Sequence, residues 1–269
     1  MGKVISINIS QVKGVEKNSI DQVEVIEGWG LEGDSHAGDW DRQVSIFPVE
    51  FLKNMPLEKK DELLNCGYTE NFTISGVEPS LLSVGNFASI GEAVIKILHI
   101  GKDQYKDYGR PYIISRQGLF GRVVKGGRVR TGDDITVYPF SEETFLRCVG
   151  EGNSTMAKVF LDGGMCPDAG DIYGATALML AARGGFSPVV LTLLKRGANV
   201  NARSDDGITA LMAAAYLGHA RTVEILLEAG ANPAFQSESG LSALSLARQQ
   251  NNEYIARILL KTKDIGNNN

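Results

Sequence analysis

The chain has 269 residues with a net charge of −5, and it is 43% hydrophobic and 22% charged, which is the balance of folded globular proteins. Its length corresponds to about two typical domains, so a small scaffold held by disulfides is excluded. Neither half carries the positive charge that nucleic-acid binding needs. Because the sequence contains no apolar run of membrane-spanning length and no signal-peptide core, we expect a cytoplasmic protein with no membrane partner.

Short β-rich runs dominate residues 1–140. Seven of them, separated mostly by Gly or Asp, are 4–9, 22–26, 43–47, 71–75, 93–98, 121–124 and 134–138. A helical interval near 49–65 interrupts them. This pattern predicts a mainly-β domain that closes, or nearly closes, into a barrel. Pro139 ends the last strand and Ser141 begins a helix signal, so we place the second domain at 141–269.

Two segments of this domain combine residue types that bind ligands. The glycine-rich segment GLEGDSHAG places Asp34 and His36 on a loop, and Arg42 follows just before a strand. Glycines let backbone N–H groups approach an anion, and Arg pairs with phosphate. Glu70 and Asn71 offer a carboxylate and an amide that can recognise the edge of a heterocycle. We expect a binding site here, and the alternative is that these side chains only cap turns.

A basic segment follows at 110–130. It contains no acidic residue and six basic ones, which are Arg110, Arg116, Arg122, Lys125, Arg128 and Arg130. Such a segment favours an anion, and the glycines within it expose further N–H groups. We therefore add Arg116, Arg122 and Lys125 to the candidate site, and a solvated charged face is the alternative.

The ordered motifs GLEGDSHAG, RQVSIF, ENFTISG, IGK and GLFGRVVKGG resemble those of the MOSC domain, which is named for the C-terminal part of molybdenum cofactor sulfurases. The resemblance covers roughly 1–138. It implies a β-barrel that binds the molybdenum cofactor, molybdopterin, through the candidate site. Its phosphate would meet the Arg and Lys side chains, and Asn71 and His36 would read the ring.

The chain departs from that family at its cysteine. The stretch where small bacterial members carry cysteines holds Gln104, Tyr105 and Tyr112 instead. A thiolate is the soft ligand for molybdenum and the nucleophile in sulfur transfer, and neither an amide nor a phenol replaces it. We therefore expect non-covalent cofactor binding and assign no catalytic residue and no metal ligand.

The three cysteines are too few and too scattered for a disulfide framework or a zinc site. Cys66 is the one cysteine left in the first domain, so an enzyme that uses it as a nucleophile remains an alternative. Cys148 and Cys166 are expected to be packing residues.

The second half of the chain repeats itself every 33 residues. GATAL at 174–178 recurs as GITAL at 207–211 and as GLSAL at 240–244, and LLKRGAN recurs in the same phase as LLEAGAN. These motifs resemble the ankyrin repeat, in which two antiparallel helices alternate with a projecting turn. The resemblance covers about 141–263 and implies about four units, of which the first and last are atypical capping units.

Local signals agree with helices at these positions. Thr176 can cap the helix ALMLAAR, and Gly197 and Gly230 stand where a helix end favours a left-handed residue. One helix pair cannot bury its own apolar face, so the pairs must stack. We expect the TAL positions and both leucines of each LL pair to form the core of that stack.

Positions that vary between repeats are the ones free to bind a partner. We expect a protein partner to contact the concave side and the turn tips through Tyr173, Arg183, Asp205, Asp206, Tyr216 and Arg248. The function that follows is a carrier of the molybdenum cofactor with a stack that binds a protein such as a molybdoenzyme. The alternative is a non-catalytic scaffold with a degenerate barrel and no small ligand.

Overall fold

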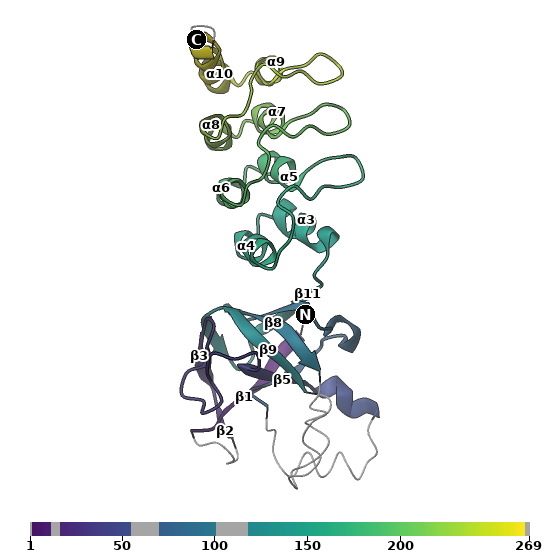
Figure 1. Cartoon of the computed structure of the whole chain (residues 1–269), viewed down its shortest axis with the longest axis vertical. Helices are drawn as coiled ribbons and strands as arrows, with labels where there is room; N and C mark the ends of the chain where they lie inside the picture. Colours follow the sequence, from purple (N-terminus) through teal and green to yellow (C-terminus); the bar gives the residue numbers. More distant parts are fainter. Residues whose placement is uncertain (1, 12–16, 55–69, 101–117, 267–269) are drawn as a thin grey trace. The chain divides into compact units, whose positions relative to one another are not determined.

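The computed structural model describes residues 2–11, 17–54, 70–100 and 118–266. The chain divides into two compact units, Met1–Phe140 and Ser141–Asn269 (Figure 1). The first unit is built of strands and the second of helices. Each unit has its own core, so the two are described one after the other.

Seven strands of the first unit close into a β-barrel. In order around the barrel they are β11 (Asp134–Tyr138), β7 (Phe87–Ile90), β8 (Ala93–Ile100), β9 (Leu119–Lys125), β5 (Val44–Pro48), β6 (Phe72–Ser75) and β1 (Gly2–Ile9). The barrel closes because β1 pairs back onto β11. Neighbouring strands are antiparallel except β5 and β6, which are parallel.

Smaller elements complete this unit. They are β2 (Asn18–Ile20), which pairs with β1, a second sheet of β10 (Gly127–Arg130), β3 (Gln22–Ile26) and β4 (Gly30–Leu31), and the 3-10 turns η1 (Val49–Asn54) and η2 (Pro79–Leu81). Alternation along the strands fills the barrel: Val44 and Ile46 of β5 lie in the core. Ser45 between them belongs to the opposite, outer face of the sheet.

The β-barrel expected from the sequence is confirmed. Each of the seven expected strands lies within two residues of an observed one, although 22–26 is β3 of the second sheet rather than a barrel strand. Of the barrel strands, β7 was not expected, because its four residues FASI are too short to show a clear alternation. Of the helical interval near 49–65, η1 is present, and residues 55–65 lie outside the described residues.

The described residues of the second unit form four helix pairs. They are α3 (Glu142–Gly150) with α4 (Ser154–Asp162), α5 (Ala177–Arg183) with α6 (Ser187–Lys195), α7 (Ala210–Tyr216) with α8 (Ala220–Glu228), and α9 (Ala243–Gln249) with α10 (Glu253–Gly266). Within this unit Figure 1 shows a row of first helices, a row of second helices and a row of projecting turns. None of the described helices is both long and apolar enough to cross a bilayer.

The helix ends repeat with the sequence. The side chains of Thr176, Thr209 and Ser242 each cap a first helix by accepting an N–H three residues on, at 3.4, 3.3 and 3.2 Å. Gly197 and Gly230 follow the second helices with φ of 87° and 89°, which is the left-handed region that glycine adopts without strain. The expected caps and glycine turns are therefore confirmed.

Only one leucine of each LL pair is fully buried, which corrects the expectation that both belong to the core. The first members, Leu193, Leu226 and Leu259, are 0%, 0% and 2% exposed. The second members, Leu194, Leu227 and Leu260, are half-buried or exposed. Successive residues of a helix point about 100° apart, so one leucine faces the core while its neighbour lies at the edge of the stripe.

Truncation of the two leucines of α8 should therefore differ. We expect Leu226→Ala to lower the free energy of unfolding of the helical unit by about 2–5 kcal/mol, as for a buried leucine that leaves a cavity. Leu227→Ala should lower this free energy clearly less, because the Leu227 side chain is only half-buried in the wild type. Urea unfolding followed by far-ultraviolet circular dichroism measures this difference.

Tryptophan fluorescence provides the internal control, because Trp29 and Trp40, the two tryptophans of the chain, both belong to the first unit. The transition that it reports should be the same in both variants. Equal losses for Leu226→Ala and Leu227→Ala would contradict the assignment of the core face.

Candidate functional site

Asp34 of the glycine-rich loop is the centre of a buried polar cluster. One oxygen, Oδ1, accepts the backbone N–H groups of Ser10 at 3.3 Å and of His36 at 3.4 Å. The other, Oδ2, accepts Nζ of Lys17 at 3.4 Å and a short hydrogen bond from Nδ2 of Asn71. The Asp34 side chain is 1% exposed and that of Lys17 is 9% exposed, so the ion pair is largely shielded from water.

Opposing effects act on the pKa of Asp34. Burial is the largest and would raise it, because a carboxylate loses hydration inside the protein. The charge of Lys17 and the hydrogen bonds from Asn71, His36 and Ser10 together act more strongly in the other direction. The pKa of Asp34 therefore lies below its ordinary value, and the group is a carboxylate at neutral pH.

Asn71 joins this loop to the barrel. Its Oδ1 accepts the backbone N–H of Ser45 at 3.0 Å and the Ser45 hydroxyl at 2.9 Å. Its Nδ2 donates to the carbonyl of Asn8 at 3.2 Å and to Asp34. An amide has two acceptor sites and two donor hydrogens, so Asn71 has no capacity left to read a heterocycle. Glu70 beside it is also buried, and its backbone carbonyl accepts from the Asn8 side chain at 3.1 Å.

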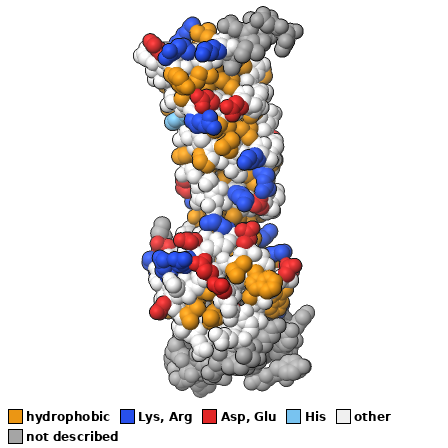
Figure 2. Space-filling view, turned by 90° about the vertical axis from the view of Figure 1, so that its left-hand side faces the viewer, with side chains coloured by type: hydrophobic (Ala, Val, Ile, Leu, Met, Phe, Trp, Pro, Cys, Tyr) orange, Lys and Arg blue, Asp and Glu red, His pale blue; other side chains and the backbone are white. Residues whose placement is uncertain are grey.

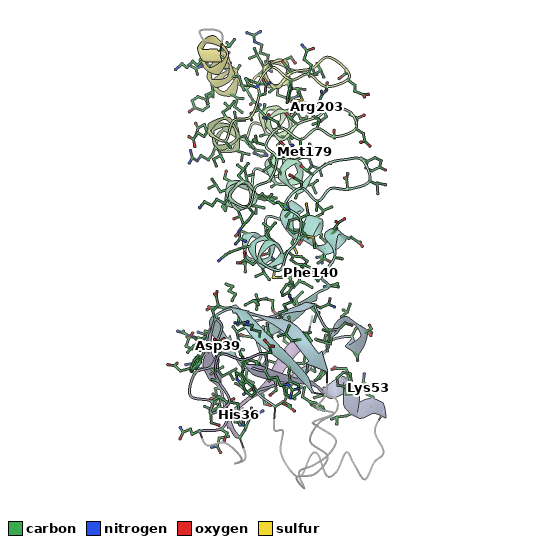
Figure 3. All side chains as sticks on the ribbon, viewed as in Figure 1. His36, Asp39, Lys53, Phe140, Met179 and Arg203 are labelled. Carbon is green, nitrogen blue, oxygen red and sulfur yellow. The ribbon has the colours of Figure 1, made fainter. Side chains whose placement is uncertain are left out.

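His36 is the part of the cluster that reaches solvent. Its Nδ1 lies 3.2 Å from Oδ1 of Asp34 and 3.3 Å from the Ser35 hydroxyl, and the side chain is 34% exposed. When Nδ1 carries a proton, it donates to the Asp34 carboxylate and so orients the ring. Trp40 fixes the loop, since its Nε1 donates to the His36 carbonyl at 2.9 Å. Figure 3 shows His36 and Asp39 on this same loop between β4 and β5.

Two guanidinium groups come from the end of this loop, at Arg42, and from strand β9, at Arg122. That of Arg42 stands 5.5 Å from the ring centroid of Phe120, and Nη2 of Arg122 lies 3.4 Å from Oδ1 of Asp39. Phe120 of β9 lies opposite Ser45 of β5, and the Ser45 hydroxyl donates to Asn71. Arg42 is thereby linked, across the outer face of the sheet, to the Asp34 cluster. The Arg122 ion pair is exposed and adds little to stability.

Of the two other basic residues expected at the site, one makes its contact elsewhere and one lies outside the described residues. Nζ of Lys125 donates to the backbone carbonyl of Glu92 at 2.9 Å. Lys125 is three residues beyond Arg122, or about 10 Å along the strand. Arg116 lies outside the described residues, as do Cys66 and the stretch that contains Gln104.

Some of the described side chains suit a pterin phosphate and others do not. Asp34 and Asn71 do not suit it, because Asp34 is a buried anion and Asn71 makes all its hydrogen bonds within the protein. Arg42 and Arg122 keep the charge that a phosphate requires. Among the described residues no three His, Cys, Asp or Glu side chains converge as a metal ion would need.

Two cysteines can be placed. Burial raises the pKa of the Cys148 thiol in α3 to about 11, so this group stays protonated and unreactive at neutral pH. Cys166 is exposed, which corrects the expectation that it is a packing residue. Its segment between α4 and α5 is a surface turn rather than part of a helix.

The helical unit has a hollow of about 540 Å³ at the ends of its first helices. The residues that line it, and define the hollow below, are Gly150 of α3, Leu180, Arg183 and Gly184 of α5 and the turn after it, and Ala213, Tyr216 and Leu217 of α7 and the turn after it. Tyr216 and Leu217 are 44% and 47% exposed. Two of the six residues expected to bind a partner, Arg183 and Tyr216, thus come together there.

The 33-residue period explains the hollow. One repeat position is Gly150 in α3, Arg183 in α5 and Tyr216 in α7. A side chain added at Gly150 would meet no atom within 4 Å, so the space is open where the first copy has only hydrogen. The large side chains of the next two copies then form its other walls.

Three more of the expected partner residues lie on turn tips. Tyr173 is 68% exposed beside Ile172, which is 87% exposed. The next tip carries Asp205 and Asp206, and the Asp205 N–H donates to the Tyr173 carbonyl at 3.1 Å. The first helices begin at these turns and end at the hollow, seven residues or about 10 Å away.

Arg248 belongs to neither group. It stands in α9 at the repeat position that is Ala182 in α5 and Ala215 in α7. Both alanines are fully buried, whereas Arg248 is exposed. The six residues therefore form a pair at the hollow, a group at the turn tips and one separate side chain.

The second unit is similar in sequence to known proteins. A family model described as ankyrin repeats, in three copies, matches residues 129–204 and 199–269. A putative ankyrin repeat-containing protein of Treponema pallidum (strain Nichols) is 39% identical over 69 residues. That match spans 26% of this chain and 23% of the relative, so it covers about a quarter of either protein.

The Asp34 cluster predicts a pH-dependent effect of Asp34→Asn. The substitution removes the charge opposite Lys17 and puts a donor where one oxygen accepted, so we expect the barrel to lose about 1.5–3 kcal/mol at pH 7. Because the folded-state pKa of Asp34 is lowered, the wild-type carboxylate stabilises the fold above its ordinary pKa. That contribution is lost as the pH falls below about 4, so the difference between the two proteins should shrink there.

Urea titrations followed by tryptophan fluorescence at pH 7, 5 and 3.5 measure this. Asp39→Asn is the matched control, because its side chain is 81% exposed and its pair with Arg122 should contribute little. A difference between wild type and Asp34→Asn that stays constant from pH 7 to pH 3.5 would contradict the assignment.

Proposed function

Because the chain belongs to the ankyrin-repeat family, we propose that its helical unit binds a protein partner and that the hollow is the contact site. Stacked repeats are widely suited to protein–protein interaction, since their buried positions are shared and their exposed ones are free to vary. An exposed free thiol such as Cys166 also fits a reducing compartment, so we propose a cytoplasmic setting.

The observation that carries this proposal is the meeting of Arg183 and Tyr216 at one hollow. Tyr and Arg are the side chains most enriched among those that dominate binding energy at protein interfaces. A concave site lets a partner side chain lose contact with water, which a flat surface does not. Leu217 adds an exposed apolar side chain at the rim.

A double substitution tests the contact site. We expect Arg183→Ala with Tyr216→Ala to abolish capture of the partner by the purified chain, with no change in the helical circular dichroism, because both side chains are exposed. Pull-down from a lysate of the source organism, followed by mass spectrometry, measures which proteins are lost.

The matched control is Tyr254→Ala with Arg257→Ala on α10, which removes the same two exposed side-chain types from a second helix. Figure 2 views the row of second helices, where hydrophobic side chains are interspersed with charged ones. Loss of the same proteins in both double variants would place the contact site elsewhere.

We propose a second candidate function for the barrel, a MOSC-like site that holds the phosphate of a molybdopterin-type cofactor, with a molybdoenzyme as the protein partner. The observation that favours it is that Arg42 stands over the Phe120 ring of β9, while Arg122 of that strand reaches Asp39 on the loop that carries His36. The cofactor would be held by these guanidinium groups without Asp34 or Asn71. The competing hypothesis is a barrel that serves as a scaffold.

Arg122→Ala separates the two hypotheses. If the barrel holds the phosphate, the substitution should weaken binding of a pterin phosphate by about 1.5–3 kcal/mol, the range for a hydrogen bond to a charged group. Isothermal titration calorimetry measures the affinity. Lys3→Ala is the control, because Lys3 is exposed and pairs with Asp134. Equal losses in both variants would mean diffuse attraction, and no binding by the wild type would favour the scaffold.

A further inference from the structure

The residues that line the hollow indicate which kind of partner segment can bind there. Resting on the proposed docking function, we infer that the hollow recognises an extended internal segment of the partner, in which a carboxylate side chain lies next to an apolar one. Three features of the described residues support it: an apolar lining, one cation that makes no ion pair among them, and a row of three helix ends.

The lining is mostly apolar or without side chains. Leu180, Ala213 and Leu217 supply hydrocarbon, and Gly150 and Gly184 expose only backbone. The volume of about 540 Å³ is many times the roughly 30 Å³ that a water molecule occupies in the liquid. A partner side chain that displaces this water onto hydrocarbon walls gains the hydrophobic contribution to binding.

Arg183 is the charged residue of the lining, and it is exposed. None of the ion pairs among the described residues involves it. In the preceding helix pair, Glu151 follows the lining residue Gly150 and pairs with Arg147 at 3.7 Å. The Arg183 guanidinium is therefore available to a carboxylate from outside, which it can bind through two parallel hydrogen bonds.

The turn that carries Arg183 is fixed in place. The Arg183 carbonyl is 3.0 Å from Nε2 of His219, which belongs to the following helix pair. A side chain added at Gly185 would meet the His219 ring at 2.6 Å, so the two turns are closely packed. A prepositioned turn orders less on binding and therefore loses less entropy.

The row of helix ends favours an internal segment over a chain end. Arg183 lies on α5, which packs between α3 and α7. Helices pack about 8–10 Å apart, so the row from α3 to α7 is about 20 Å long, or about six residues of extended chain. A terminal carboxylate bound at the middle helix would leave half of the row unused, whereas an internal segment follows all of it.

The turn tips would not accept the same segment. They carry Asp171, Asp205, Asp206 and Glu238, which are exposed. Like charges would repel an acidic partner segment there. The acidic segment is therefore disfavoured at the turn tips and favoured at the hollow, where Arg183 supplies the opposite charge.

Selection of random twelve-residue peptides, displayed with flanking residues on both sides, tests the inference on the full chain. We expect the wild type to enrich peptides with Asp or Glu one or two positions from Leu, Ile or Phe. Arg183→Glu should lose that preference. For one enriched peptide, fluorescence anisotropy should show at least tenfold weaker binding to Arg183→Ala and to the peptide with Gln in place of Glu, with little further loss when both changes are combined.

The outcomes separate the inference from the proposed function. Arg221→Ala on α8 is the control, and it should leave the affinity unchanged because this exposed Arg pairs with Glu224 away from the hollow. Enriched peptides that need Leu217 but show no acidic preference would overturn the inference and leave the docking site intact. Peptides insensitive to both Leu217→Arg and Tyr216→Ala would contradict docking in the hollow itself. A selection that enriches nothing would also count against the inference.

Discussion

A helix pair of this chain can bury its apolar side only against the next pair, and the architecture of the second unit depends on that constraint. Ala182 and Ala215 are fully buried at one repeat position, while Arg248 at the same position in α9 is exposed. Packing thus determines the repeated residues and leaves the exposed positions free to differ. Gly150 and Tyr216 occupy such a free position, and the difference in their size opens the hollow.

The barrel uses its polar residues in another way. Asp34 and Asn71 hydrogen-bond to each other and to the strands, so they attach the glycine-rich loop to β1 and β5. Their polar groups are used within the protein and do not face a ligand. If one of the two side chains were removed, the other would be buried without a hydrogen-bond partner. The free-energy cost of that unpaired group exceeds the net contribution of the hydrogen bond to stability. Among the described residues of the expected site, the His36 ring and the guanidinium groups of Arg42 and Arg122 still reach solvent.

Sequence was sufficient for features that depend on local spacing. The 33-residue period predicted the caps at Thr176 and the glycine turns, because each signal lies within one repeat. It could not tell Leu226 from Leu227, since the face that a helix buries depends on its neighbours. The bond between Asp34 and Asn71 joins residues 37 positions apart, and no sequence pattern marks Lys17 as their partner. The sequence therefore predicts, wrongly, that the side chains of Asp34 and Asn71 face a ligand.

Photo-crosslinking in cells would show whether the partner touches the hollow. The photoreactive amino acid p-benzoylphenylalanine would replace Tyr216 in one variant and Tyr254 in another, which keeps an aromatic ring at two exposed positions. If the partner docks in the hollow, it should crosslink from position 216 and not from position 254. A partner that crosslinks from position 254 alone, or equally from both, would contradict docking in the hollow.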